Sequence, residues 1–322
     1  MSYFVVGLFM LYFGAGWLVK GSSSLASSLG LTPLVIGITI VAFGTSAPEL
    51  FISVVSSIKN KSMIALGNVI GSNICNIALV LGVTALFHPV TGSRSVIQRD
   101  IPVMLGISLY LLVLSLNSTI GRLEGVTLFS GIILFTYYNL FVANRERTIV
   151  SHRVRMESVP DTGEIEYVTS RPKQLALILV GIAGVVLGAD ILVDAAVKFM
   201  KVLGVNEKFV GLTVVAFGTS VPELATSVVA AVKKEMDISI GNLIGSNVFN
   251  MLSVLGAASI VRPIQIPGGF VQSGLLIDYL VMMGISFLPL LLMKKDNTVQ
   301  RIEGLLLLVC YVGYVAYLVA KT

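Results

Sequence analysis

The sequence GTSAPEL, from Gly44 to Leu50, recurs as GTSVPEL from Gly218 to Leu224, and this pair of heptapeptides decides the fold. Each copy lies in a long apolar stretch, yet each carries a proline, a glutamate and two hydroxyls. A shift of 174 residues aligns positions 37–82 with 211–256 without a gap, and 26 of these 46 positions are identical. Similarity of this extent indicates an internal duplication.

The composition is that of a protein embedded in a lipid bilayer. Hydrophobic residues make up 55% of the 322 positions and charged residues only 12%, whereas a soluble domain has about 25% charged residues. The net charge of +5 is better explained by basic loops on the cytoplasmic side of a membrane than by nucleic-acid binding. Two cysteines in apolar segments provide neither a disulfide framework nor the ligand spacing of a zinc site.

Apolar stretches long enough to span a membrane predict an all-α polytopic protein with ten transmembrane helices. We expect them near residues 2–19, 33–58, 62–87, 101–118, 123–143, 174–200, 207–232, 237–261, 272–293 and 302–320. The polar stretch between the fifth and sixth helices, with charges of both signs and two prolines, reads as a solvated linker. The predicted domains are a first five-helix repeat (1–143), the linker (144–173) and a second five-helix repeat (174–322).

An odd number of helices per repeat makes the second copy enter the membrane from the opposite side. Inverted repeats of this kind are typical of secondary transporters, whose substrate site lies near the midplane. Counted by loop, 14 of the 22 Lys and Arg residues fall on the side of the central linker, which predicts a cytoplasmic linker and external termini. We expect a multi-pass protein of the plasma membrane that functions as a monomer.

The repeated motif itself predicts a cation site. Pro48 has no N–H and crowds the preceding turn, so the carbonyls near Gly44 and Thr45 lose helical partners, and Pro222 does the same in the second copy. Thr45 and Glu49 are four residues apart and share a helix face. A charge at the bilayer centre costs from about 3 to more than 10 kcal/mol and marks a candidate functional site. No Lys or Arg lies in these segments, so Glu49 and its repeat mate Glu223 need a metal ion or protons as partners.

The next helix of each repeat carries a second motif, GNVIGSNICN (67–76) or GNLIGSNVFN (241–250). Ser72 and Asn76 share one face, as do Ser246 and Asn250, and they offer hydroxyl and amide oxygens. Oxygen donors without imidazole or thiolate favour Ca²⁺ and Na⁺ over zinc or copper. The duplicated residues are as consistent with hydrogen bonds between helices as with a role as ion ligands; they are Asn68, Asn242, Asn73 and Asn247.

These repeated GTSxPE and GNxxGSN blocks resemble the alpha repeats of the calcium/cation antiporter superfamily, and specifically its prokaryotic sodium/calcium exchangers. The resemblance covers essentially the whole chain and implies a Ca²⁺ site made by Glu49 and Glu223 with the carbonyls of Thr45 and Thr219. It also implies flanking Na⁺ sites and a central asparagine pair, drawn from Ala42, Thr45, Ser46, Ser72, Asn76, Ala216, Thr219, Ser220, Ser246 and Asn250. Some exchangers carry Asp where Asn250 stands, so this site holds two carboxylates rather than three.

The expected function is exchange of Ca²⁺ for Na⁺ by alternating access, with both ions as transported substrates and no cofactor. The mobile part is expected to be the first and sixth helices, and Asp190 and Asp194 in the sixth are candidates for an accessory role. The alternatives are a Ca²⁺/H⁺ antiporter that uses the same glutamates as proton carriers and a passive cation channel. The motifs of intramembrane hydrolases are missing, so an enzyme is not expected.

Overall fold

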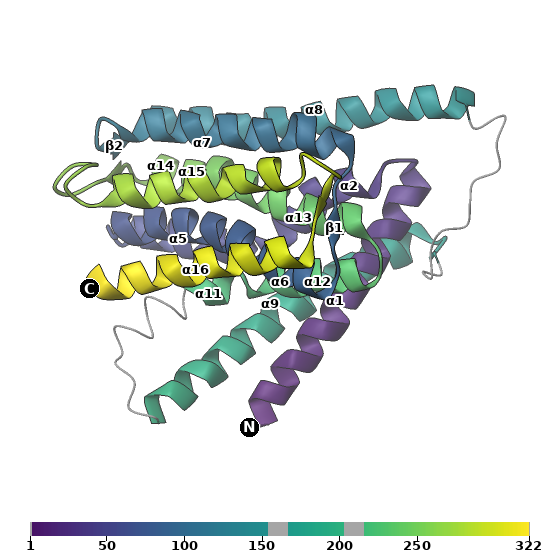
Figure 1. The fold of residues 1–322 in the computed structure, drawn as a ribbon, viewed down its shortest axis with the longest axis horizontal. Coiled ribbons are helices and arrows are strands. Elements are labelled where there is room, and N and C mark those ends of the chain that lie inside the picture. The colour runs from purple at the N-terminus through teal and green to yellow at the C-terminus, as the bar shows by residue number, and fades with distance from the viewer. Residues whose placement is uncertain (1, 154–166, 203–215, 322) are drawn as a thin grey trace.

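The computed structural model describes residues 2–153, 167–202 and 216–321, and most of the described chain is helical (Figure 1). In the described ranges, eight helical stretches are long and apolar enough to cross a membrane, and one bent pair of helices makes a possible ninth. The chain is therefore a helical, multi-pass membrane protein. Residues 154–166 of the expected linker (144–173) and the first part of the expected span 207–232 lie outside the described residues.

The first half contains five apolar units. The first is α1 (Ser2–Leu29), and the second is a broken run of α2 (Pro33–Ile36), η1 (Gly37–Val41), α3 (Ala42–Thr45) and α4 (Ala47–Ile58). The third is continuous through α5 (Ser62–Ile74), η2 (Cys75–Leu81) and α6 (Gly82–Phe87). The last two are η3 (Val96–Asp100) with α7 (Ile101–Ser115), and α8 (Arg122–Arg153).

The second half follows the same order. It comprises α9 (Arg171–Val202), α11 (Ala216–Thr219), α12 (Val221–Val232), α13 (Met236–Phe249), η5 (Asn250–Val254), α14 (Leu255–Val261), α15 (Leu275–Leu292) and α16 (Arg301–Lys321). Four two-residue strands join the halves at the loops. The strand β1 (Val90–Thr91) pairs antiparallel with β4 (Thr298–Val299), and β2 (Thr119–Ile120) pairs antiparallel with β3 (Ile264–Gln265).

The centre of the bundle is formed by the two helices that carry the GNxxGSN motif. In the spans Ser62–Phe87 and Met236–Val261, 78% and 83% of the most apolar window is buried, against 11% in α16. Helices α7, α8, α15 and α16 lie outside them and expose large apolar side chains, as lipid-facing helices do. A Cβ at Gly245 would lie 2.6 Å from the Ile38 carbonyl oxygen, so this glycine permits close packing of α13 on η1.

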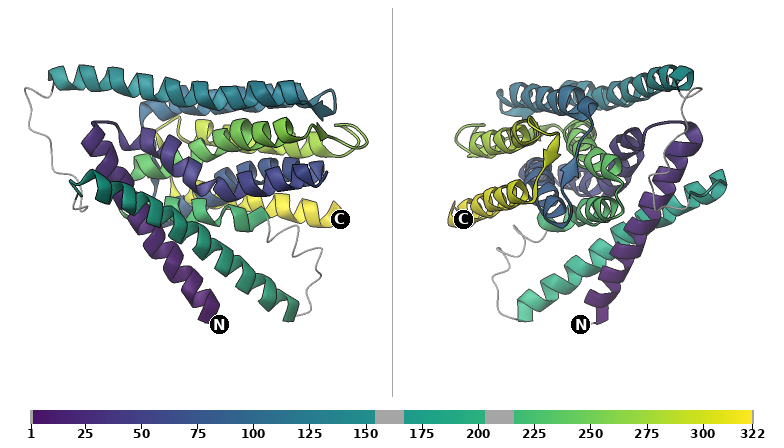
Figure 2. Two further views of the ribbon diagram at one scale, coloured as in Figure 1. Left: turned by 180° about the vertical axis from the view of Figure 1, so that it is seen from behind. Right: turned by 45° about the vertical axis from the view of Figure 1, so that its right-hand side comes forward.

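Helices α1 and α9 form a separate pair that crosses the rest of the bundle obliquely (Figure 2). The expectation that the first helix ends near residue 19 is wrong, because α1 continues through the serine-rich segment to Leu29. Ser22, Ser23 and Ser24 are buried there, and a Cβ at Gly21 would lie 2.9 Å from the Gln174 carbonyl oxygen of α9. The serines belong to a packed helix face rather than to a loop.

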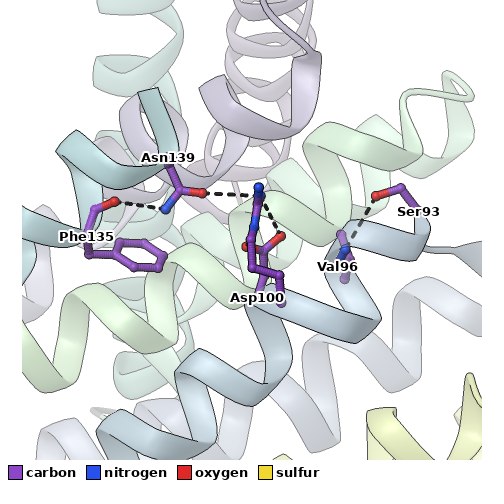
Figure 3. Close-up of polar contacts among 6 residues, drawn as sticks. Ser93, Val96, Asp100, Phe135 and Asn139 are labelled. Atoms are coloured by element: carbon purple, nitrogen blue, oxygen red, sulfur yellow. Dashed lines mark hydrogen bonds and ion pairs between the residues drawn. The ribbon is translucent and has the colours of Figure 1, made fainter. Parts of the chain in front are cut away.

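A buried ion pair links the start of α7 to α8 (Figure 3). The Arg99 guanidinium donates to both carboxylate oxygens of Asp100, at 2.7 and 3.2 Å, and to the side-chain oxygen of Asn139 at 3.4 Å. Asn139 in turn donates to the Phe135 carbonyl at 2.9 Å, and Asp100 is only 1% exposed. A bidentate pair with further hydrogen bonds is the arrangement in which a buried charge is tolerated.

Candidate cation site

The helix that carries the first motif breaks at Ser46, as the proline predicts. The segments Pro33–Thr45 and Ala47–Ile58 meet at an angle of 47°. The regular backbone ladder ends where the Ser46 N–H donates to the Ala42 carbonyl, and it resumes where the Leu50 N–H donates to the Ser46 carbonyl. The carbonyls of Gly44 and Thr45 fall between these bonds and are left for other donors or for a cation.

The second motif breaks at the equivalent residue. Ser220 has φ −90° and ψ 2°, close to the φ −85° and ψ 8° of Ser46, and Pro222 lies in the first turn of α12 as Pro48 does in that of α4. The Ser220 N–H donates to the Phe217 carbonyl and the Leu224 N–H donates to the Ser220 carbonyl. Both breaks therefore have similar serine dihedral angles and the same position of proline, although the Ser46 N–H bonds to the carbonyl four residues before it and the Ser220 N–H to the carbonyl three residues before it.

The two glutamates are completely buried and face each other. Glu49 and Glu223 are both 0% exposed, and they are close enough for their charges to repel. Glu223 accepts a hydrogen bond at its Oε1 from Ser46 at 2.9 Å and a weaker one from Ser246 at 3.5 Å. The bond from Ser46 crosses between the two halves of the chain, so both repeats contribute to this carboxylate.

Glu49 is less well satisfied than Glu223. Neither of its carboxylate oxygens has a hydrogen-bond partner among the described residues, and the Oε2 of Glu223 has none either. The hydroxyls of Thr219 and Ser72, which lie 3.4 Å from each other, are the side chains that face Glu49. Buried polar atoms normally have partners, so three unpartnered carboxylate oxygens at one place need a physical explanation.

The two central asparagines are fully buried and lie on unusual turns. Asn76 is in η2 and Asn250 begins η5, and both segments have the wide π-helical turn that occurs often at functional sites. The Asn76 amide donates to the Asn247 oxygen at 3.1 Å, which leaves its own oxygen unpartnered. Neither polar atom of the Asn250 side chain has a partner among the described residues, and Asn250 is 0% exposed.

The remaining predicted site residues are Thr45, Ser220, Ala42 and Ala216. Thr45 donates to the Asn242 oxygen at 3.1 Å, and the unpartnered Ser220 hydroxyl is buried. Ala42 is fully buried at the start of α3, and Ala216 begins α11, although its side chain lies outside the described part of the chain. The hydroxyls of Ser46, Ser72, Thr45, Thr219 and Ser246 thus face the two glutamates, whereas no described contact joins Ala42, Ala216, Ser220, Asn76 or Asn250 to them.

Two asparagines hold the backbone of the glutamates, and the two serines that these asparagines bind were not predicted. The Asn68 amide donates to the Glu49 carbonyl at 3.2 Å and to the Ser53 hydroxyl at 2.9 Å. In the second half, Asn242 donates to the Glu223 carbonyl at 3.4 Å and to the Ser227 hydroxyl at 3.0 Å. Asn68 and Asn242 are therefore interhelical hydrogen-bonding residues, one of the two roles that the sequence left open.

The other candidates lie away from this point. Asp190 and Asp194 are exposed on α9, and His88 follows the end of α6, where its Nδ1 lies 3.1 Å from the Pro89 carbonyl oxygen. No group of three or more His, Cys, Asp or Glu residues that could hold a metal occurs in the described ranges. The site therefore depends on two carboxylates together with neutral oxygens.

This geometry agrees with the comparisons. The profile of the family described as "Sodium/calcium exchanger protein" matches residues 1–145 and 173–320. The chain belongs to the sodium/calcium exchanger family. Among its relatives in this family, the sodium/calcium exchanger MaX1 of Methanosarcina acetivorans is 31% identical over 98% of this chain and 97% of its own length. The putative antiporter CaxA of Alkalimonas amylolytica is 33% identical over 96% of this chain and 95% of its own length.

Solved structures of the sodium-calcium exchanger NCX_Mj share the fold of this exchanger-family chain. One of them, soaked with Na⁺ and Sr²⁺, has a TM-score of 0.81 and 31% sequence identity, and the match covers 98% of this chain and 97% of NCX_Mj. The chain is therefore a membrane transporter of the exchanger family and not an enzyme.

Proposed function

We propose that this protein is a secondary antiporter that exchanges Ca²⁺ for Na⁺, with Ca²⁺ held between Glu49 and Glu223. The observation that carries the proposal is the pair of fully buried, mutually repelling carboxylates with three unpartnered oxygens. Their described hydrogen-bond donors are serine hydroxyls and not cationic side chains. A divalent cation supplies the missing charge and uses these oxygens as ligands.

The neutral donors support the same choice of ion. The carbonyls left by the two helix breaks, the hydroxyls near each glutamate and the oxygens of Asn76 and Asn250 are all hard donors, suited to Ca²⁺ and Na⁺. We assign Ca²⁺ to the glutamates with the carbonyls of Thr45 and Thr219. We assign Na⁺ to flanking positions formed by Ala42, Thr45, Ser46 and Ser72 on one side and by Ala216, Thr219, Ser220 and Ser246 on the other.

The site opens alternately to the two sides of the membrane as two inverted five-helix repeats change their arrangement. The proposed repeats are residues 1–143 and 174–322, with ten spans in all, a cytoplasmic linker and external termini in the plasma membrane. The equivalent breaks at Ser46 and Ser220 support the repeat, and the exchange of both ions at the same carboxylates couples their transport. A single chain contains both halves of the site, so the monomer is the functional unit.

One alternative uses the same residues with a different counter-ion. In a Ca²⁺/H⁺ antiporter, protonation of Glu49 and Glu223 would release Ca²⁺, and two adjacent buried carboxylates are a suitable place for a proton. The predicted site has two carboxylates and an asparagine at position 250, and this composition does not distinguish Na⁺ from H⁺ as the counter-ion. The names of the relatives favour Na⁺.

Radioactive ⁴⁵Ca²⁺ uptake into proteoliposomes separates the two. Vesicles are loaded with Na⁺ at equal pH on both sides and compared with matched vesicles loaded with K⁺ or choline. We expect uptake only when Na⁺ is inside, because outward Na⁺ movement drives Ca²⁺ entry. Uptake that ignores Na⁺ and follows an imposed pH gradient would contradict the Na⁺-coupled mechanism and support proton coupling.

A further inference from the structure

Lys233, at the end of α12, contacts the middle of α1. Lys233 follows the last residue of α12, and its ammonium donates to the Gly16 carbonyl at 3.2 Å. A Cβ at Gly16 would also lie 3.2 Å from the Lys233 Nζ. Lys233 therefore reaches from the site-bearing helix to the oblique α1–α9 pair, at a position where glycine leaves room for it.

Helix α1 covers one face of α12 along this contact. Leu11 and Ala15 of α1 pack in one apolar cluster with Val221, Ala225 and Val229 of α12. The repeat equivalent of this contact would join α9 to α4, and no comparable contact between these two helices occurs within the described residues. Phe51, which is the repeat equivalent of Ala225, is 70% exposed. The two halves are thus in different arrangements, with α12 covered and α4 uncovered.

The repeat shift of 174 residues gives every member of the Lys233 contact a counterpart. Lys233 corresponds to Lys59 at the end of α4, and Gly16 corresponds to Asp190 in α9. Helical residues around Gly16, LYFGAGWLV (11–19), align with VVLGADILV (185–193) in α9. Lys59 and Asp190 are both exposed, and they form no ion pair with each other among the described contacts.

We propose that Lys59 and Asp190 are positioning residues that form an ion pair in the opposite access state, in the place that the Lys233–Gly16 contact occupies here. The proposal rests on the alternating access proposed above. If the two repeats exchange arrangements during the cycle, α9 moves onto the exposed face of α4. The Asp190 carboxylate then approaches the Lys59 ammonium. Each state is then held by one lysine at the end of a motif helix.

The two contacts differ in charge, so they stabilise their states unequally. Lys233 meets only a carbonyl oxygen, while Lys20 repels it and Glu235 partly compensates. Burial and the charge of Lys20 both lower the pKa of the Lys233 ammonium. The counterparts of Lys20 and Glu235 are Asp194 and Lys61, so Lys59 would meet two carboxylates of α9, with the single positive charge of Lys61 in the place of Glu235. The opposite state therefore gains an attraction that the described state lacks.

Chemical cross-linking tests the juxtaposition directly. Both proposed contacts join the first half to the second, so a protease site inserted between residues 154 and 166 yields two fragments unless a cross-link holds them. The background carries Cys310→Ser, because Cys310 is partly exposed while Cys75 is buried. A short bifunctional methanethiosulfonate is added to membranes that contain Lys59→Cys/Asp190→Cys.

Two matched pairs serve as controls. Gly16→Cys/Lys233→Cys joins positions that the structure places together, and Lys59→Cys/Lys233→Cys pairs one residue of each half that neither proposed state brings together. We expect cross-links in the test pair and in the first control only. No cross-link in the test pair while Gly16→Cys/Lys233→Cys is joined would overturn the proposal, and so would efficient joining of Lys59→Cys/Lys233→Cys.

Charge variants then test whether the pair sets the balance between states. A bias toward one state raises apparent Ca²⁺ affinity at the face where that state is open. We expect Lys59→Gln and Asp190→Asn each to change the ratio of the apparent Ca²⁺ affinities at the two faces by about two- to fivefold, the size of an exposed ion pair. The double variant should add nothing further, and Gly16→Asp should shift the ratio the same way by pairing with Lys233.

These readouts distinguish the ion pair from the proposed coupling. A purely structural role for Asp190 or Lys59 would lower the amount of folded protein or the maximal rate and leave the affinity ratio unchanged, which would overturn the charge argument. Loss of Na⁺ dependence in the uptake assay, with the Lys59→Cys/Asp190→Cys cross-link intact, would reject Na⁺ coupling and retain the ion pair.

Discussion

Two buried acidic sites in this protein are built in opposite ways. Asp100 is 1% exposed and receives two hydrogen bonds from Arg99, which also contacts Asn139 (Figure 3). Glu49 is 0% exposed and has no hydrogen-bond partner among the described residues. The first carboxylate is neutralised by the protein itself, whereas the second has no cationic side chain paired with it among the described residues.

The contrast teaches that burial alone does not identify a transport site. A permanent partner makes a buried charge structural, because the protein carries the compensating charge through every state. An unpartnered buried carboxylate lowers the stability of the fold, so such a residue is a candidate functional group. The predictions below test this distinction by removing charge or partner at each site.

Removal of charge at the glutamates should have the largest effect. Glu49→Gln and Glu223→Gln each keep the shape of the side chain, and we expect Ca²⁺ exchange to fall by about 100-fold or more because one of two charges that hold Ca²⁺ is lost. The fold should be unharmed, and thermal stability in Ca²⁺-free detergent should be unchanged or higher. Uptake by proteoliposomes and a melting curve measure the two effects, and robust exchange in either variant would remove the proposed site.

Removal of the partner at Asp100 should give the reverse pattern. Arg99→Met leaves a buried carboxylate without its cation, which we expect to destabilise the protein by about 3 kcal/mol. Exchange per folded molecule should change little, because this pair lies outside the proposed ion pathway. The matched variant Arg99→Met/Asp100→Leu should recover most of the lost stability, and an unaltered melting temperature in Arg99→Met would show that Asp100 does not depend on this partner.

The duplicated parts of the site could be predicted from the sequence. The repeat makes Glu49 and Glu223 the candidate functional residues because a duplication that only built a scaffold does not explain repeated acids in apolar segments, and the prolines predict the breaks seen at Ser46 and Ser220. Ser53 and Ser227 could also have been found, because they are duplicated four residues after each glutamate. They are not candidate ion ligands, because they bind the asparagines that hold the glutamate carbonyls.

Other features had no local sequence signal. The π-helical turns at Asn76 and Asn250 lie in the two central helices, and no residue pattern in the sequence specifies a wider turn. The serines of α1 read as a loop because their burial depends on α9, which is distant in sequence. The Arg99–Asp100 pair was missed because adjacent opposite charges near a helix start usually indicate a solvated loop, and the partner Asn139 lies 40 residues away.

A third carboxylate at the site would sharpen the comparison. Asn250 is fully buried with no described partner, so Asn250→Asp adds a charge next to two others. We expect the apparent Ca²⁺ affinity to rise by about tenfold, because ligand charge tunes Ca²⁺ binding, and the stability without Ca²⁺ to fall. Equilibrium ⁴⁵Ca²⁺ binding measures the first effect, with Asn76→Asp as the matched variant of the other repeat. Weaker Ca²⁺ binding in both variants would show that the asparagines do not face the ion.

The smallest expected effect compares the two serines at the helix breaks. Ser46 donates to Glu223 at 2.9 Å, whereas its repeat equivalent Ser220 has no partner in the described arrangement. A hydrogen bond of this kind contributes about 0.5 to 3 kcal/mol, so Ser46→Ala should weaken apparent Ca²⁺ affinity about three- to tenfold at the face where this arrangement is open. If the repeats exchange arrangements, Ser220→Ala should have a similar effect at the other face only. Equal effects of each variant at both faces, measured in vesicles of opposite orientation, would show that the difference between Glu49 and Glu223 is fixed and does not alternate.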